Sequence, residues 1–254
     1  MDTDVARYLD ALADAARDVL GDALVGAYAA GSVALDAYRP GRSDVDVALV
    51  CAAPLAEPVK RALVARLRHE ALPCPARGLE LVVYTRDNAR SGTAEPGFEL
   101  ELNSGERMDF RATYAPDQRP PADGLFWYAL DRSILHQHGR ALFGEPAAGA
   151  FAEIDDLRPP LRDALTWWLA RPGPVPGDAV LGACRALARI RHGAWLDKLA
   201  AGRRIIADGD PDADLIARCV AAGDGAAPDP DAARAFQRRV LAEISAGDPA
   251  GITA

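Results

Sequence analysis

The sequence predicts an α+β protein, with a mixed α/β sheet domain over residues 1–154 and an all-α helical bundle domain over residues 155–254. Two observations support this division. Strand and helix patterns alternate through the first part, and strand patterns stop after about Asp155. The chain of 254 residues is 50% hydrophobic and 26% charged, which provides enough apolar material for two ordinary domain cores.

The first part begins with an amphipathic helix over residues 5–20, because its apolar residues recur at helical spacing and Gly21 follows them. Short apolar or alternating runs predict strands over residues 23–29, 44–50, 78–84 and 98–102. Helical patterns cover residues 33–38, 58–72 and 125–142. The run Asn103-Ser104-Gly105 predicts a turn directly after the last of these strands.

The second part contains only helical patterns, separated by loops rich in proline, glycine and aspartate. The expected helices cover residues 157–170, 178–200, 212–222 and 229–244. Asp229 is suited to cap the last helix, and Pro230 is suited to its first turn.

Composition excludes several classes of protein. The 29 Lys and Arg residues against 37 Asp and Glu give a net charge of −8, and without a basic block the chain is a poor binder of nucleic acid. No apolar run approaches the roughly 20 residues that span a bilayer, and acids interrupt the first apolar residues. We therefore expect a cytoplasmic monomer with neither a nucleic-acid nor a membrane partner. The four cysteines form no CxxC motif, which argues against zinc or redox chemistry.

Two aspartates at the start of a predicted strand indicate a metal site. Asp44 and Asp46 are two residues apart, so their side chains lie on the same side of the strand while Val45 faces the core. Neighbouring carboxylates repel each other unless a cation lies between them. Mg²⁺ is the natural cation for such a pair, and it commonly shares its coordination shell with substrate phosphates.

Other polar residues of the same half complete a candidate catalytic site. Gly31-Ser32 lies at a strand-to-helix turn, where backbone N–H groups can approach a phosphate closely. Glu80, inside a neighbouring strand, would hold a second ion or take the proton from an attacking hydroxyl. Arg39 and Arg42 would neutralise other phosphate oxygens. Together these residues predict metal-assisted nucleotidyl transfer, in which a hydroxyl attacks an α-phosphate and pyrophosphate leaves.

The segment GSVALDAYRPGRSDVDVALV resembles the signature of the DNA polymerase β-type nucleotidyltransferase superfamily. Most of the chain resembles the aminoglycoside nucleotidyltransferases of the streptomycin/spectinomycin adenylyltransferase type. The run VLGACR, which ends at Arg185, and the later Lys198 are similar to the Arg…Lys pair of that family. The run Leu79-Glu80-Leu81 resembles the strand that bears the family's catalytic base.

This resemblance implies an O-adenylyltransferase in which ATP, the co-substrate, binds between the two domains. Asp44 and Asp46 would bind Mg²⁺, with Glu80 as a further metal ligand or as the base that deprotonates the acceptor hydroxyl. The residues predicted to bind ATP are Gly31, Ser32, Arg42, Ser43, Arg185 and Lys198.

The resemblance also implies a small cationic acceptor of the aminoglycoside or aminocyclitol class, for which Asp178 and Trp168 are the candidate binding residues. The chain departs from the family here. Asp178 is the only acid between residues 171 and 178, and Arg171 stands near where an acid is expected. The run Gly105-Glu106-Arg107 lacks the tryptophan expected of a streptomycin-modifying enzyme. The identity of the acceptor is therefore open.

Two other functions are compatible with the same motifs. The first is nucleotidyl transfer to a protein or RNA acceptor, as in nucleotidyltransferase antitoxins, although the acidic chain disfavours RNA. The second is a non-catalytic nucleotide sensor. Single residues also have simpler interpretations: Glu80 in a structural salt bridge, Asp178 as a helix cap, and Arg185 and Lys198 as solvent-facing charges.

Overall fold

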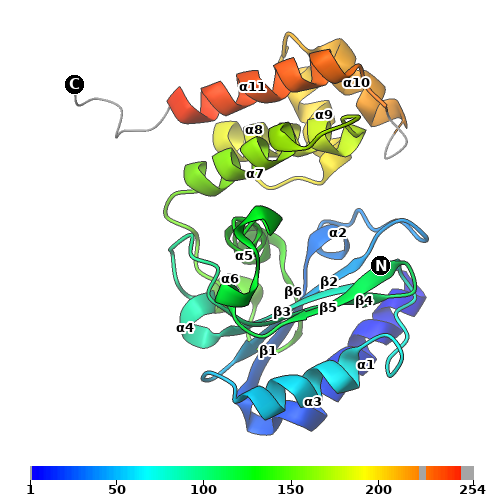
Figure 1. Ribbon diagram of the computed structural model, residues 1–254, viewed down its shortest axis with the longest axis vertical. Helices are drawn as coiled ribbons and strands as arrows, with labels where there is room; N and C mark the ends of the chain where they lie inside the picture. Colours follow the sequence, from blue (N-terminus) through cyan, green and yellow to red (C-terminus); the bar gives the residue numbers. More distant parts are fainter. Residues whose placement is uncertain (1, 223–226, 247–254) are drawn as a thin grey trace, which may run out of the picture. The chain divides into compact units, whose positions relative to one another are not determined.

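The protein is described by a computed structural model that covers residues 2–222 and 227–246. The chain divides into two compact units, residues 1–155 and 156–254. Figure 1 draws both along the colour gradient of the sequence.

The first unit is built around a mixed sheet, in which the described residues form six strands in the order β5-β4-β3-β2-β1-β6. The strands are β1 (Leu24–Ala29), β2 (Val45–Cys51), β3 (Leu79–Thr85), β4 (Phe98–Gly105), β5 (Met108–Thr113) and β6 (Arg140–Phe143). Only β2 and β3 pair in parallel, and every other neighbouring pair in this sheet is antiparallel. The predicted mixed α/β sheet is thus confirmed.

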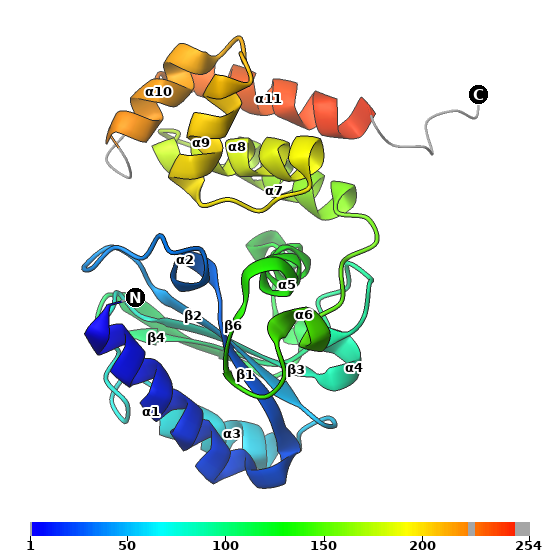
Figure 2. The same ribbon diagram turned by 180° about the vertical axis from the view of Figure 1, so that it is seen from behind.

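Helices cover both faces of this sheet. Those of the first unit are α1 (Thr3–Leu20), α2 (Gly31–Ala34), α3 (Glu57–Leu67), α4 (Arg86–Ala89), α5 (Trp127–His138) and α6 (Ala147–Ala150). The short 3₁₀ turns are η1 (Gly21–Ala23), η2 (Pro116–Gln118) and η3 (Pro121–Asp123). Figures 1 and 2 show α1 and α3 together under one face, with α5 and α6 on the other side.

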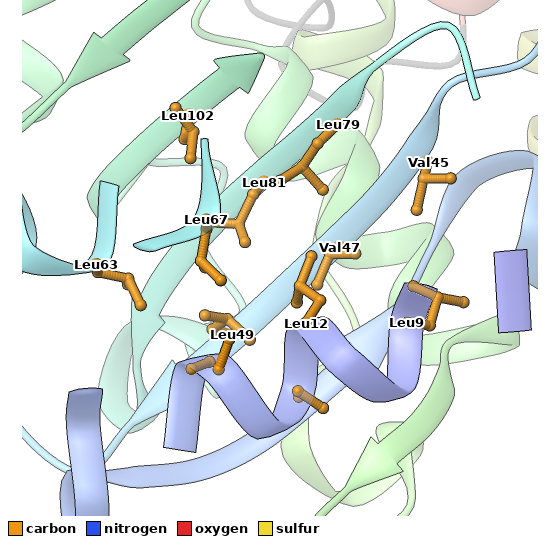
Figure 3. Packing of buried hydrophobic residues seen from close by; sticks show 14 of the residues in the cluster. Leu9, Leu12, Val45, Val47, Leu49, Leu63, Leu67, Leu79, Leu81 and Leu102 are labelled. Atoms are coloured by element: carbon orange, nitrogen blue, oxygen red, sulfur yellow. The ribbon is translucent and has the colours of Figure 1, made fainter. Parts of the chain in front are cut away.

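The face under α1 and α3 carries the larger apolar core. Leu9 and Leu12 of α1 and Leu63 and Leu67 of α3 are buried against it, as Figure 3 shows. Their partners on the strands are Val45, Val47, Leu49, Leu79, Leu81 and Leu102. Because successive side chains of a strand alternate between faces, this packing places the side chains of Asp46 and Glu80 on the opposite face.

That opposite face holds a second apolar cluster with an aromatic centre. Tyr28 and Tyr84 of the sheet pack edge-on against Phe151, at ring-centroid distances of 5.2 and 6.2 Å. Tyr128 of α5 packs against Phe98 at 4.5 Å. The cluster fixes α5 over the sheet, on the face to which Asp46 and Glu80 belong.

The second unit contains helices only in its described residues. They are α7 (Arg158–Ala170), α8 (Gly177–His192), α9 (Lys198–Ala207), α10 (Ala213–Ala222) and α11 (Pro230–Ala246). Helix α8 contacts each of the other four helices, so it forms the centre of the bundle. Leu181, Cys184 and Leu187 on α8 are fully buried, as are Phe236 and Val240 on α11.

The helix expected over residues 58–72 ends at Leu67, and two further predicted helices are wrong in extent. The helix expected over residues 178–200 is two helices, because Gly193 adopts a left-handed conformation (φ 69°) that ends α8. Asp197 then caps α9 by accepting the backbone N–H groups of Leu199 and Ala200. The helix expected over residues 125–142 ends at His138, and the chain continues as β6, which pairs with β1.

The turn expected at Asn103-Ser104-Gly105 is also wrong. Strand β4 continues through Gly105, and Glu106 and Arg107 form the turn that leads into the unpredicted strand β5. Gly105 lies so close to the residues that precede β3 that a Cβ atom at position 105 would overlap the backbone of Arg77 and Gly78. The glycine therefore serves close strand packing rather than the turn.

Candidate active site

The three predicted carboxylates come together where β2 and β3 begin. Asp46 lies directly opposite Glu80 in the parallel pairing of β2 with β3, and neighbouring strands are about 4.8 Å apart. Both side chains are half-buried. Asp44 precedes Asp46 by two residues, and its charge acts on both of the other carboxylates.

Burial and mutual repulsion perturb these carboxyl groups. Burial raises the pKa of Asp46 well above its usual value, and the charges of Asp44, Glu80 and Asp131 raise it further. Burial also raises the pKa of Glu80 to about 7, with Asp44 and Asp131 adding to the shift. A carboxylate with a pKa near neutrality is suited to accept a proton during a reaction.

The Gly31-Ser32 turn lies against Asp46. Strand β1 ends at Ala29, and Gly31 adopts a left-handed conformation (φ 51°) in which a Cβ atom would overlap the Asp46 carboxylate. The backbone N–H of Ser32 donates to that carboxylate, which opposes the rise in its pKa. The Ser32 hydroxyl is buried and has no hydrogen-bond partner among the described residues. An unsatisfied hydroxyl in this position fits a phosphate oxygen as its partner.

The loop before Asp44 is closed by reciprocal bonds between Arg39 and Ser43. The N–H of Arg39 donates to the Ser43 hydroxyl, and the N–H of Ser43 donates to the Arg39 carbonyl, both at 3.0 Å. The Ser43 carbonyl accepts the N–H of Arg77 at 3.1 Å, which ties the loop to the segment that leads into β3. Arg42 is exposed within this loop. The residues of this loop that were predicted to bind phosphate, Arg42 and Ser43, thus directly precede the carboxylate pair in sequence.

Of the two predicted sets of magnesium ligands, the pair Asp44 and Asp46 fits the structure better than the set that also includes Glu80. In residues 2–222 and 227–246, no three or more His, Cys, Asp or Glu side chains form an arrangement that could hold a metal ion. Glu80 therefore gains no support as a third ligand. Asp44 and Asp46 still offer a pair of oxygen donors, and Mg²⁺ is commonly bound through one or two carboxylates and completed by substrate phosphates. Magnesium binding remains a prediction.

In the helical unit, two residues predicted for different ligands pair with each other. Lys198, the first residue of α9, donates through its Nζ atom to the Asp178 carboxylate at 2.6 Å. Asp178 lies in the first turn of α8, where Pro176 is the N-cap residue, so its interpretation as the cap is wrong. Arg185 lies two turns along the same side of α8, and its guanidinium is 5.5 Å from the ring centroid of the buried Trp195.

Trp168, the other predicted acceptor residue, belongs to a small aromatic cluster at the end of α7. Its ring meets that of Trp167 edge-on at 5.0 Å. The Arg171 guanidinium lies over both rings, at 4.1 Å from Trp167 and 5.6 Å from Trp168. Arg171, which stands where an acid was expected, is thus engaged by the tryptophans.

Sequence patterns missed a fourth carboxylate near the site. Asp131 lies on α5, and its charge raises the pKa of both Asp46 and Glu80. The neighbouring Arg132 is buried and donates to the carbonyls of Thr93 (2.8 Å) and Glu95 (2.6 Å), which anchors α5 to that loop. No motif marks Asp131, because it approaches the carboxylates only through the packing of α5.

Of the comparisons with known proteins, the one with solved structures bears on the fold. No protein-family model and no curated protein matches the sequence. Among solved structures, the chain is similar to the crystal structure of spectinomycin adenyltransferase AAD(9) from Enterococcus faecialis with ATP and spectinomycin. The TM-score is 0.68 at 14% sequence identity, over 95% of this chain and 99% of that chain. The chain therefore has the fold of this adenyltransferase, as the predicted resemblance requires.

The length and the hydropathy of the helices are the structural features that bear on membrane association. Among the described residues, none of the helices combines the length and the apolar character that a membrane span needs.

Proposed function

We propose that the protein is a nucleotidyltransferase that transfers the adenylyl group of ATP to a hydroxyl of a small cationic acceptor and releases pyrophosphate. The observation that carries this proposal is the position of Asp46 directly opposite Glu80, beside the Gly31-Ser32 turn. The fold shared with an adenyltransferase supports the general class.

Nucleotide binding follows from the groups around the carboxylates. The buried Ser32 hydroxyl, with no protein partner in the described chain, would donate to a phosphate oxygen, and Ser43 and Arg42 would bind the others. Mg²⁺ held by Asp44 and Asp46 would neutralise charge on the phosphates. Lys198 and Arg185 are proposed as further cationic contacts of ATP.

Glu80 is proposed as the general base. Its pKa of about 7 lets it take the proton from the acceptor hydroxyl near neutral pH. The hydroxyl oxygen then forms a bond to the α-phosphorus, while the bond from that phosphorus to the α,β-bridging oxygen breaks. Pyrophosphate leaves with the electron pair of this bond, and the acceptor becomes an O-adenylyl ester.

The charge of the site favours a cationic acceptor. Asp131 adds a negative charge near Glu80, beyond the two aspartates assigned to magnesium. An amine on the acceptor would offset this charge once the hydroxyl is in place. An aminoglycoside or aminocyclitol combines both groups, which is why we propose that class.

The test is a pyrophosphate-release assay with ATP and magnesium against streptomycin, spectinomycin and related aminocyclitols, with GTP in place of ATP as a comparison. Wild-type turnover that Glu80→Gln abolishes supports the proposal. In a parallel incubation with labelled ATP, label retained on protein or RNA would instead indicate a macromolecular acceptor. Calorimetric binding of ATP without turnover of any acceptor would indicate a nucleotide sensor.

A further inference from the structure

Asn103 lies in a row of polar side chains that crosses the sheet from the proposed catalytic residues to the edge strand. Asn103 of β4 is directly opposite Glu80 of β3 on one side and Arg111 of β5 on the other. Glu80 in turn faces Asp46 of β2. Residues directly opposite each other in a sheet share one face, so these four side chains lie on the face of the proposed active site.

The Asn103 side chain has no hydrogen-bond partner in the described fold. It is half-buried, and none of the residues 2–222 or 227–246 forms a hydrogen bond with it. Its neighbour Ser104 faces the other side of the sheet, where its hydroxyl accepts the N–H of His69 at 2.8 Å. Asparagine is depleted in strands, since it adds little to sheet packing. An asparagine in the middle of β4 therefore needs another explanation.

The polar residues around Asn103 are already engaged. Arg111 pairs with Glu101 at 3.0 Å and with Asp123 at 3.6 Å. Glu101 is buried and also pairs with Arg119, which donates to the hydroxyl of Tyr128 at 2.6 Å. This network holds β4 and β5 in a fixed position and leaves the Asn103 amide available beside Glu80.

We propose that Asn103 determines acceptor specificity by binding a second polar group, on the carbon next to the reacting hydroxyl. Facing side chains of an antiparallel pair have Cβ atoms about 5 Å apart, so a carboxylate and an amide can reach adjacent substituents. Two polar groups on neighbouring carbons lie about one hydrogen-bond length apart. The acceptor would thus be a vicinal diol or amino alcohol. This inference rests on the proposed function and refines its acceptor.

The test compares wild type with Asn103→Ala and Asn103→Asp, using spectinomycin and streptomycin as acceptors in the pyrophosphate assay. Loss of one hydrogen bond should raise the KM for the acceptor about tenfold in Asn103→Ala, with the KM for ATP within about twofold of wild type. Asn103→Asp places another carboxylate opposite Glu80, so the acid limb of its pH profile should move to higher pH. The pH shift tests only that position 103 lies beside Glu80, whereas a purely structural residue would not produce the KM split.

The control is Gln118→Ala, which removes an exposed amide of the same chain whose bond is to the N–H of Tyr114. It should leave both KM values unchanged. The accepted compound is also compared with a derivative that lacks the neighbouring polar group. With wild type, kcat/KM for the derivative should be about tenfold lower than for the parent compound. With Asn103→Ala, kcat/KM should be the same for both compounds. Turnover with an unchanged acceptor KM in Asn103→Ala would overturn this inference alone. If neither compound is accepted, the same comparison uses whichever aminocyclitol of the panel is turned over. Absence of wild-type turnover across the whole panel would overturn the proposed function together with this inference.

Discussion

Gly31 and Asp46 are so close that no side chain fits between them. A Cβ atom at position 31 would overlap the Asp46 carboxylate, and the glycine also has a φ of 51°, which other residues rarely adopt. The backbone of the β1–α2 turn thus lies directly on a proposed magnesium ligand. The site depends on this glycine for space as well as for conformation.

Gly31→Ala should therefore weaken ATP binding about tenfold or more, because Asp46 must move out of its position. Isothermal titration calorimetry with ATP and magnesium measures this. Gly209→Ala is the matched control, since Gly209 also has a positive φ (78°) but no neighbouring atom within 4 Å of an added Cβ. The control should lose about 1 kcal/mol of stability and keep its affinity for ATP. Equal ATP affinity in Gly31→Ala and wild type would contradict the placement of the nucleotide.

Burial of Glu80, with the repulsion of Asp44 and Asp131 added to it, predicts a pH-dependent cost to stability. The pKa of Glu80 rises from 4.5 to about 7 on folding, so between these values the folded state holds a proton that the unfolded state releases. The free energy of unfolding therefore falls as pH rises through this window. Glu80→Gln should be more stable than wild type by roughly 1–3 kcal/mol at pH 8 and about equal to it at pH 4.

Urea unfolding of both proteins at the two pH values, without magnesium, measures this difference. Glu106→Gln, at the exposed β4–β5 turn, is the control and should match wild type at both pH values. A Glu80→Gln variant that is less stable than wild type at pH 8 would show that Glu80 has a stabilising partner instead.

Asp131→Asn tests the fourth carboxylate. Removing its charge should lower the pKa of Glu80, so the acid limb of the kcat/KM profile should move to lower pH and activity at pH 6 should rise relative to pH 8. Asp87→Asn on α4 serves as the control. A profile that does not move, measured from pH 5.5 to 8.5, would contradict the influence of Asp131 on Glu80.

The ion pair between Lys198 and Asp178 makes opposite predictions for its two members. The pair is partly exposed, so its own contribution to stability should be below about 1 kcal/mol. Lys198→Met should weaken ATP binding, because the proposed cationic contact with ATP is lost. Asp178→Asn should preserve or modestly strengthen ATP binding, because Lys198 is released, while it raises the KM for the acceptor. Weaker ATP binding by Asp178→Asn would show that Asp178 positions Lys198 instead.

The parts of the site that could be predicted from sequence are those that local patterns determine. Alternation along the predicted strand places Asp44 and Asp46 on one side, although β2 itself begins at Val45. The apolar neighbours of Glu80 mark it as a residue inside a strand, which β3 confirms. The four predicted strands of the first part are confirmed for the same reason, since each has a clear apolar pattern.

The parts that escaped prediction depend on contacts between distant segments. Asp131 reaches the carboxylates only through the packing of α5, and Lys198 reaches Asp178 only because α9 packs on α8. Asn103 looked like a turn residue, because Asn-Ser-Gly is common in turns and the pairing of β4 with β5 is not visible in the local pattern. Gly193 was hidden inside a continuous helical periodicity.

The most direct test of the central claim is pyrophosphate release by wild type and Glu80→Gln, with ATP, magnesium and the panel of aminocyclitol acceptors. Wild type should release pyrophosphate with at least one acceptor, and Glu80→Gln should be slower by about 10²- to 10⁴-fold while calorimetry shows that it still binds ATP. Full activity in Glu80→Gln would contradict the assigned base. Absence of acceptor-dependent release by the wild-type protein would contradict nucleotidyl transfer to this class of acceptor.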